Sequence, residues 1–311
     1  MTLRNLGKSG LRVSLVGLGC NNFGGRMDLE SSRLVIHKAL DAGITLFDTA
    51  DAYGNRGGSE TVLGQVLGDR RKDIVLASKF GLPMDDKEKR GASRRYIVAA
   101  LEASLTRLKT DWIYLYQVHK PDPLTPIEET LRALDDLVTA GKVRYIGCSN
   151  FAPAEIVEAQ WTARHLGFEA FVSAQDEYSL LKRDLDADKL PVLQRYGLGL
   201  LPFFPLASGL LSGKYKRGEP ISGTRLAAGQ VFAERFLTEA NWAIVEKLET
   251  FAQARGHTML ELAFSWLAAR PCVGSIIAGA TRPEQIEANV KAAGWALSTE
   301  DLAEIDRLTA H

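Results

Sequence analysis

The sequence predicts an α/β protein that folds as a (β/α)8 barrel, in a single domain covering residues 1–311. Eight short apolar runs alternate with longer amphipathic stretches, which is the pattern of strand–helix units around a parallel sheet. Eight such units in 311 residues fit a closed barrel. The alternative is an open, doubly wound sheet, which requires G-x-G-x-x-G after the first strand. Asn22 stands where the third glycine belongs, so the barrel is favoured.

The strands are predicted from the apolar runs in chain order. A β-hairpin is expected first, because runs at 3–6 and 11–15 flank a loop with Gly7 and Gly10 at its two ends. Eight barrel strands are expected at 13–18, 45–47, 74–78, 112–117, 143–146, 170–173, 198–202 and 273–277.

Helices are predicted between these strands. In the stretch 93–109, Ile97, Leu101, Leu105 and Leu108 recur at helical spacing. Thr-x-x-Glu motifs at 125–128, 258–261 and 281–284 have the capping-box pattern and predict helix starts. One segment, 206–233, follows the seventh strand and shows no periodicity. A loop of that length in a compact domain usually serves binding, so we expect it to contact cofactor and substrate.

Composition excludes several classes of function. The 38 basic and 38 acidic residues cancel, so the charge expected of a nucleic-acid or membrane-surface binder is absent. No apolar run approaches the roughly 18 residues that a membrane span needs, and the N-terminus lacks a signal-peptide pattern. Three scattered cysteines argue against a disulfide framework, and no histidine has metal-ligand spacing. A cytoplasmic protein without a metal site is expected.

Four ionisable side chains lie at adjacent predicted strand ends. Asp48 and Tyr53 follow the second strand, Lys79 ends the third, and His119 follows the fourth. Each alone has an ordinary structural explanation, as a cap, a rim residue or a solvated charge. Barrel enzymes carry their catalytic groups at the carboxyl ends of strands, however, so four neighbouring ends predict one site.

Two other chemistries are suggested by single residues. Lys79 could form a Schiff base if it were desolvated, which would make the chain an aldolase-like barrel. Ser149 could be a nucleophile, but the run around it lacks the second glycine of a nucleophile elbow. The first remains the alternative enzymatic interpretation.

Seven runs in this order make the whole chain resemble the aldo-keto reductases, NADPH-dependent (β/α)8 oxidoreductases. The resemblance is strongest to the branch that holds bacterial general reductases and the β subunits of voltage-gated potassium channels. The runs are RNLGKSGL (4–11), FDTA (47–50) followed by YG (53–54), SKF (78–80), LYQVH (115–119), GCSNF (147–151), LASG (206–209) and GAT (279–281).

The resemblance implies that Asp48, Tyr53, Lys79 and His119 are the family's catalytic tetrad. Tyr53 would protonate the carbonyl oxygen of an aldehyde or ketone as it receives a hydride, or act in reverse on the alcohol. A tyrosine pKa of about 10 is poorly matched to neutral pH, and the Lys79 ammonium, held by Asp48, would lower it. His119 would hydrogen-bond the carbonyl oxygen and orient it.

The resemblance also assigns the cofactor contacts. Two positions depart from the family: Phe204 replaces a usual serine, and Ala288 replaces a frequent acidic residue. Phe203 would keep the stacking face of the usual Tyr or Trp. The assigned residues are Gly19, Cys20, Asp48, Ser149, Asn150, Gln175, Phe203, Leu206, Ala207, Ser208, Lys214, Arg225, Gly279, Thr281, Gln285 and Asn289.

NADPH is the expected cofactor, with NADH as a weaker ligand. Lys214 and Arg225 lie in the long loop and could hold the 2′-phosphate, as could Arg282.

The substrate pocket is expected to be apolar, with Asn21, Phe23, Phe80 and the stretch 120–124 in its wall. A small carbonyl compound is the expected substrate, but its identity, the reaction direction and the choice between monomer and homo-oligomer stay open. A regulatory, channel-β-like NADPH-binding subunit is the non-enzymatic alternative.

Overall fold

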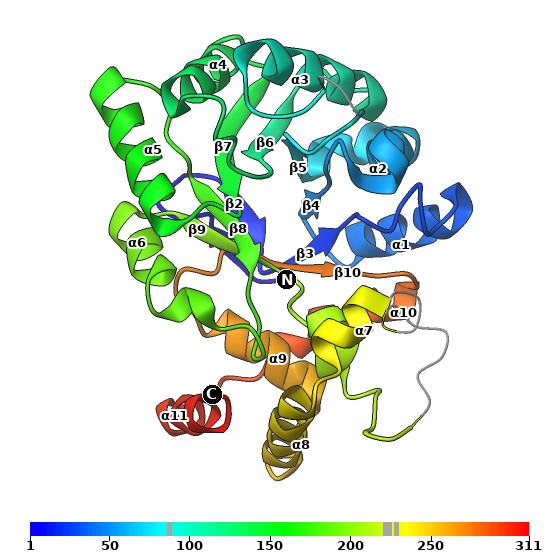
Figure 1. Ribbon diagram of the computed structural model, residues 1–311. Coiled ribbons are helices and arrows are strands. Elements are labelled where there is room, and N and C mark those ends of the chain that lie inside the picture. Colours follow the sequence, from blue (N-terminus) through cyan, green and yellow to red (C-terminus); the bar gives the residue numbers. More distant parts are fainter. Residues whose placement is uncertain (86–88, 220–225, 227–229, 311) are drawn as a thin grey trace.

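Eight parallel strands form the barrel of the computed structural model, which describes all residues except 86–88, 220–225, 227–229 and 311. Neighbouring strands follow chain order, β10-β3-β4-β5-β6-β7-β8-β9, and a bridge between Leu200 and Val273 links β9 to the segment before β10. The predicted barrel is confirmed (Figure 1). The strands are β3 (Val16–Gly19), β4 (Leu46–Asp48), β5 (Val75–Phe80), β6 (Ile113–Val118), β7 (Val143–Ser149), β8 (Ser173–Glu177), β9 (Gly199–Phe203) and β10 (Ile276–Gly279).

Helices surround the strands on the outside (Figure 1). They are α1 (Leu29–Asp41), α2 (Tyr53–Val66), α3 (Arg94–Leu108), α4 (Ile127–Thr139), α5 (Pro153–Leu166), α6 (Lys189–Tyr196), α7 (Gln230–Phe236), α8 (Glu239–Gln253), α9 (Met259–Ala268), α10 (Pro283–Ala292) and α11 (Thr299–Leu308), with short 3-10 turns η1 (Gly68–Asp73), η2 (Asp184–Asp186) and η3 (Ala207–Ser212). The helix expected over 93–109 is α3, which Ser93 caps through the backbone amide of Tyr96.

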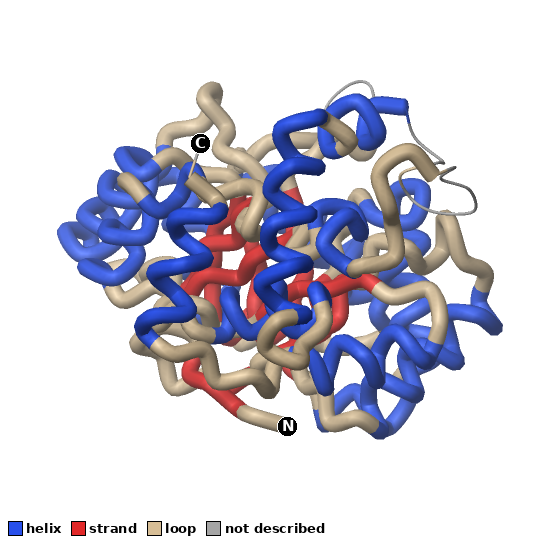
Figure 2. The backbone as a smooth tube through the Cα atoms, turned by 90° about the horizontal axis from the view of Figure 1, so that it is seen from below, coloured by secondary structure: helices blue, strands red, loops and turns tan. Residues whose placement is uncertain are grey.

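The N-terminal hairpin closes the base of the barrel. Strands β1 (Leu3–Asn5) and β2 (Arg12–Ser14) pair antiparallel, as predicted, and lie below the barrel in Figure 2. Leu6, Leu11 and Val13 of this hairpin pack against inward-facing strand residues in one apolar cluster. Gly7 has φ +60°, and a Cβ there would lie 2.3 Å from the carbonyl oxygen of Gly197, so the close approach requires glycine.

Three of the predicted strands differ most from the structure, while the others are shifted or extended at an end by one to three residues. The run 13–18 divides into β2 of the hairpin and β3 of the barrel, because the chain changes direction near Leu15. The run 273–277 begins too early, since β10 starts at Ile276. The strand expected at 170–173 is Ser173–Glu177, whose Ser-Ala-Gln-Asp-Glu sequence has no apolar run because its inward residues belong to the site described below.

One of the three predicted capping boxes forms. Thr258 caps α9 reciprocally with Glu261, as its motif predicts. The other two motifs correctly predict helix starts, since α4 begins at Ile127 and α10 at Pro283, but neither helix has a side-chain cap. Thr281 instead bonds to Gln285, whose Oε1 accepts from the Thr281 amide at 2.7 Å.

Alternation along the strands separates the barrel interior into two levels. In β5, Val75 and Ala77 belong to the apolar cluster above the hairpin, and Lys79, two residues further, reaches the polar end. In β4, Leu46 and Asp48 have the same relation. The strands therefore present apolar side chains below and polar ones at their carboxyl ends, where the site forms.

Candidate active site

The four residues expected at adjacent strand ends meet at one place. Lys79 Nζ donates to Asp48 Oδ2 at 2.8 Å, to the carbonyl oxygen of Thr49 at 2.8 Å and to the Tyr53 hydroxyl at 3.3 Å. The rings of Tyr53 and His119 pack edge to face, with centroids 5.6 Å apart. Lys79 is fully buried and Asp48 is 2% exposed, so the ion pair is shielded from bulk water.

Two amides fix the carboxylate of Asp48. Its Oδ1 accepts from Gln175 Nε2 at 2.8 Å and from Gln117 Nε2 at 3.3 Å, and its Oδ2 accepts from Lys79. The three donors come from β5, β6 and β8. A buried charge needs such compensation, and these donors satisfy both oxygens of the carboxylate.

The electrostatics of the site keep Lys79 charged and His119 neutral. Burial alone would lower the pKa of Lys79, but Asp48 and Tyr53 outweigh it and raise the pKa above its usual value. Burial, with the charges of Lys79 and Lys120, lowers the pKa of His119 to about 2. The imidazole is therefore neutral near pH 7, and its Nδ1 has no hydrogen-bond partner among the described residues.

Tyr53 differs from the expectation drawn from the sequence. Burial raises its pKa, while the nearby ammonium of Lys79 pulls in the opposite direction, and the net shift is upward. The lysine thus offsets part of the cost of burying the phenolate without reversing it.

A left-handed turn follows Tyr53 directly. Gly54, Asn55, Arg56 and Gly57 have φ values of 65°, 60°, 67° and 113°. Such a run is strained for residues other than glycine, and the surrounding contacts must hold it. A Cβ on Gly57 would lie 2.7 Å from the side chain of Arg107.

The same arginine anchors the turn to the barrel. Arg107 Nε donates to Glu60 Oε2 at 2.8 Å, and Ser78 donates to the other oxygen of this fully buried carboxylate. Ser78 precedes Lys79 in β5. The network therefore ties the segment that carries Tyr53 to the strand that carries Lys79.

Asp51, between Asp48 and Tyr53, gives a pH-dependent prediction. Burial and the charge of Glu60 raise the pKa of Asp51 from 3.8 to about 7. The folded state therefore binds a proton that the unfolded state releases, and this contribution to stability falls as pH rises from about 4 to about 7. Asp51→Asn removes the dependence, so its stability relative to the parent should grow by roughly 3 kcal/mol between pH 5 and pH 8.

Urea denaturation at both pH values measures this difference. Asp111→Asn, at an exposed position, is the matched control and should show no such growth. A constant difference between Asp51→Asn and the parent would show that Asp51 is ionised in the folded protein throughout this range.

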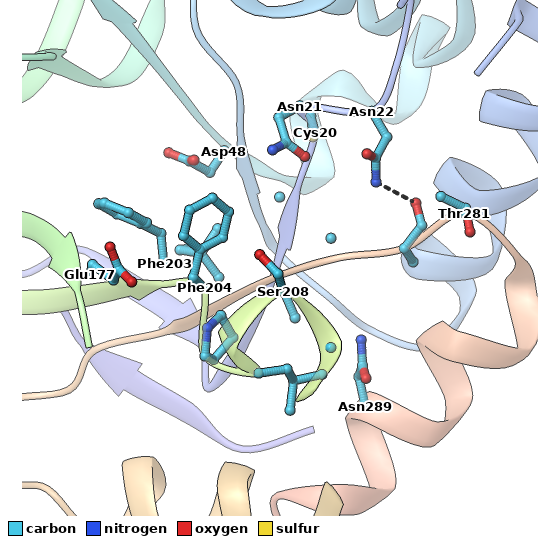
Figure 3. A pocket seen from close by; sticks show the side chains of 18 of the residues that line it. Cys20, Asn21, Asn22, Asp48, Glu177, Phe203, Phe204, Ser208, Thr281 and Asn289 are labelled. Atoms are coloured by element: carbon cyan, nitrogen blue, oxygen red, sulfur yellow. Dashed lines mark hydrogen bonds between the residues drawn. The ribbon is translucent and has the colours of Figure 1, made fainter. Parts of the chain in front are cut away.

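A cavity of about 990 Å³ lies above the tetrad at the carboxyl ends of the strands (Figure 3). Most of the residues expected to bind cofactor or substrate line it. These are Gly19, Cys20, Asn21, Asp48, Tyr53, His119, Ser149, Asn150, Gln175, Phe203, Leu206, Ser208, Lys214, Gly279, Thr281, Gln285 and Asn289.

Some expected residues lie elsewhere. Lys79 and Ala207 are buried behind the wall of the cavity, and Arg225 lies outside the described residues. Phe23 and Phe80 are fully buried in the core and do not form the expected substrate wall. Phe80 follows Lys79 in β5, so it points to the opposite face, where its ring packs on Tyr116 at 4.8 Å.

Other residues line the cavity although no sequence pattern pointed to them. They are mainly Asn22, Arg26, Glu177 and Arg235. Glu177 ends β8, so a correct register for that strand would have placed it at the rim. Arg26 lies in the loop after the first barrel strand, where barrel proteins carry site residues. No sequence motif distinguishes it from other charged loop residues.

The lining suits an elongated ligand with an aromatic ring at one end and phosphates further along. Figure 3 shows Asp48, Phe203 and Phe204 on one side of the cavity and Thr281 and Asn289 on the other. Ser208 faces the space between, and its buried hydroxyl has no hydrogen-bond partner among the described residues. A phosphate or ribose oxygen would satisfy it. A nicotinamide dinucleotide fits this set of donors.

The barrel with its buried Lys–Asp–Tyr site is typical of barrel oxidoreductases, and comparison with known proteins identifies the family. A model of the aldo/keto reductase family matches residues 15–310, and the chain belongs to this family of oxidoreductases. It is 38% identical to L-glyceraldehyde 3-phosphate reductase of Escherichia coli O157:H7, across 99% of this chain and 92% of that protein. It is 36% identical to a probable voltage-gated potassium channel subunit beta of Oryza sativa subsp. japonica, across 94% and 91% of the two chains.

Two features are absent from the residues that the structure describes. No group of three or more His, Cys, Asp or Glu side chains in that part of the chain could hold a metal ion. None of the helices described is long and apolar enough to span a membrane.

Proposed function

We propose that the protein is an NADPH-dependent carbonyl reductase, which reduces aldehydes or ketones by hydride transfer and can oxidise the corresponding alcohols. The observation that supports this most is the contact of the Lys79 ammonium with both Asp48 and the Tyr53 hydroxyl at the floor of a large cavity. Family membership and similarity to a bacterial reductase support the same reaction. We expect it to act in the cytoplasm.

A bound NADPH would supply the hydride, and the side chains would manage the oxygen of the substrate. Tyr53 donates its proton to that oxygen as negative charge develops there. Lys79 stabilises the resulting phenolate, and Asp48 keeps the ammonium charged and in place. His119 is neutral, so its ring N–H donates a hydrogen bond that orients the carbonyl group.

Residues on the two sides of the cavity divide the cofactor between them. Ser149, Asn150 and Gln175 would hold the nicotinamide amide, and Phe203 would stack on the ring. Leu206, Ser208, Lys214 and Arg225 would surround the pyrophosphate and 2′-phosphate, with Ala207 buried behind them. Gly279, Thr281, Gln285 and Asn289 would bind the adenosine. Gln285 keeps only its NH₂ group for this purpose, because Thr281 occupies its oxygen.

NADPH is expected to bind more tightly than NADH. Lys214 and Arg282 both line the cavity, and Arg225 lies in the same loop as Lys214. A charge-assisted pair with the 2′-phosphate contributes about 1.5–3 kcal/mol, or one to two decades in Kd. Fluorescence titration with both cofactors measures the preference.

Variants assign that preference to residues. Lys214→Ala and Arg225→Ala should each weaken NADPH binding and leave NADH binding nearly unchanged. Equal dissociation constants for the two cofactors in the parent protein would contradict the proposal. If both variants keep the preference for NADPH over NADH, other residues bind the 2′-phosphate.

A turnover assay with the parent protein tests the proposed function. NADPH oxidation in the presence of a panel of aldehydes should show turnover, and a protein that binds NADPH without turnover would support the regulatory-subunit alternative. The Schiff-base alternative is disfavoured by the ion pair of Lys79 with Asp48, because a protonated amine is a poor nucleophile.

A further inference from the structure

A buried ion pair behind the active site is not used by the proposed reaction. Glu60 of α2 is fully buried, and Arg107 reaches it from the neighbouring helix α3 (Figure 1). Arg107 Nε and Nη2 lie 2.8 and 2.7 Å from Glu60 Oε2. Neither residue lines the cavity, so neither would touch the cofactor or the substrate. Any effect of the pair on the reaction must therefore pass through the residues that it contacts.

The pair contacts the chain beside two of the reacting groups. Ser78, which precedes Lys79 in β5, donates a hydrogen bond to the second oxygen of the buried carboxylate. The Arg107 side chain lies against Gly57, in the left-handed turn that begins directly after Tyr53, and a Cβ on Gly57 would be 2.7 Å from Arg107 Cδ. One ion pair thus contacts both the strand that carries the lysine and the turn that follows the tyrosine.

The contact between that lysine and that tyrosine is the longest of the three that the ammonium makes. Lys79 Nζ lies 2.8 Å from both Asp48 Oδ2 and the carbonyl oxygen of Thr49, but 3.3 Å from the Tyr53 hydroxyl. The last distance is at the upper end of the range for such hydrogen bonds. Two of the four residues in the turn are not glycine and have left-handed φ values, so the turn needs outside contacts to keep its shape. A small displacement of the turn would therefore break the contact.

We propose that Arg107 is a positioning residue for carbonyl reduction, and that its pair with Glu60 keeps the Tyr53 hydroxyl within reach of Lys79. The inference rests on the proposed function. Tyr53 donates its proton only as charge develops on the substrate oxygen, so its alignment affects the chemical step and leaves NADPH binding unchanged.

Arg107→Ala tests this role, and Arg107→Lys is the variant that should rescue it. The lysine keeps a positive charge for Glu60 and a methylene stem against Gly57. The single-turnover rate with saturating NADPH should fall by about tenfold to one-hundredfold in Arg107→Ala, the effect of misplacing a reacting group from a distance. Most of this loss should be restored in Arg107→Lys. The Kd for NADPH should stay at the parent value in both variants.

Arg183→Ala is the matched control for loss of an ion pair. Arg183 lies 2.6 Å from Asp186, its side chain is 19% exposed against 23% for Arg107, and it does not line the cavity. This variant should lose stability in urea without slowing the chemical step.

A second variant disturbs the same contact from the side of the turn. Gly57→Ala adds the Cβ that would collide with Arg107, so it should also slow the chemical step. In the Arg107→Ala background the same change should cost less, because the collision is gone. Gly167→Ala is the control for backbone strain, since Gly167 has φ +71° and an added Cβ there would meet nothing within 4 Å. If Arg107→Ala does not fold, Gly57→Ala decides the question.

A measurement on the cofactor-free protein makes the test independent of turnover. The ¹³C NMR signal of the Tyr53 ring carbon that bears the hydroxyl can be assigned by its loss in Tyr53→Phe. It should shift in Arg107→Ala and Gly57→Ala and stay in place in Arg183→Ala and Gly167→Ala.

Three results would overturn the positioning role. They are a parent-like single-turnover rate in both Arg107→Ala and Gly57→Ala, an unmoved Tyr53 signal in both, and a loss of rate matched by an equal loss of NADPH affinity. Absence of turnover with every aldehyde in the parent would instead contradict the proposed reductase function, and the Tyr53 signal would still show whether Arg107 positions the hydroxyl.

Discussion

Tyr53→Phe is expected to fold, to bind NADPH and to lose about 10²- to 10⁴-fold in kcat for carbonyl reduction, because a positioned general acid contributes that much. The hydroxyl lost is the one that Lys79 Nζ contacts at 3.3 Å. The ring remains and can still pack edge to face with His119. Single-turnover kinetics with saturating NADPH measures the chemical step directly.

Tyr116→Phe is the matched control for this prediction. Tyr116 is a fully buried tyrosine on β6 whose hydroxyl has no hydrogen-bond partner among the described residues, and it does not line the cavity. Removing that hydroxyl should leave the chemical step within about threefold of the parent. If Tyr53→Phe keeps more than about a tenth of the parent rate, Tyr53 is not the proton donor.

Lys79→Met should destabilise the fold and abolish turnover together. Removing one partner of a buried ion pair leaves an uncompensated charge, and such variants typically lose about 3–5 kcal/mol of stability. Asp48 would keep its two amide donors but lose the ammonium at 2.8 Å. Tyr53 would lose the only cation that contacts its hydroxyl within the described structure. Urea denaturation and turnover below the transition measure the two effects.

A second buried pair separates stability from catalysis. Lys189 Nζ lies 2.6 Å from Asp176 Oδ1, and both side chains are less than a tenth exposed. Lys189→Met should destabilise the protein by a similar amount, yet its folded fraction should retain turnover. If Lys79→Met retained turnover when folded, the proposed role of the lysine would be wrong.

Alternating apolar and amphipathic segments were enough to predict the barrel, the hairpin and most strands. The tetrad could be located because Asp48 and Lys79 lie at the ends of apolar runs, and parallel strands bring such ends to one rim. Apolar periodicity does not predict a strand correctly where polar site residues occupy its inward positions. The inward residues Ser173 and Gln175 make β8 polar, so the apolar pattern placed that strand too early.

Other features depend on geometry that sequence patterns do not encode. Phe80 was expected in the substrate wall, but it follows Lys79 in β5, and adjacent strand residues face opposite sides. The left-handed turn at 54–57 includes Asn55 and Arg56, and tertiary contacts through Arg107 and Glu60 hold it. Arg26 lines the cavity because of how the loops pack in the folded protein, which no sequence pattern indicates.

Because the hairpin of β1 and β2 seals the floor of the barrel, the reaction chamber is a dead end. Cofactor and substrate would both enter and leave through the opening at the carboxyl ends of the strands. Of two molecules that share such a chamber, the one seated deeper has to arrive first and depart last. The order in which cofactor and substrate bind would then depend on Leu6, Leu11 and Val13 of the hairpin, which lie at the opposite end of the barrel from the reacting atoms.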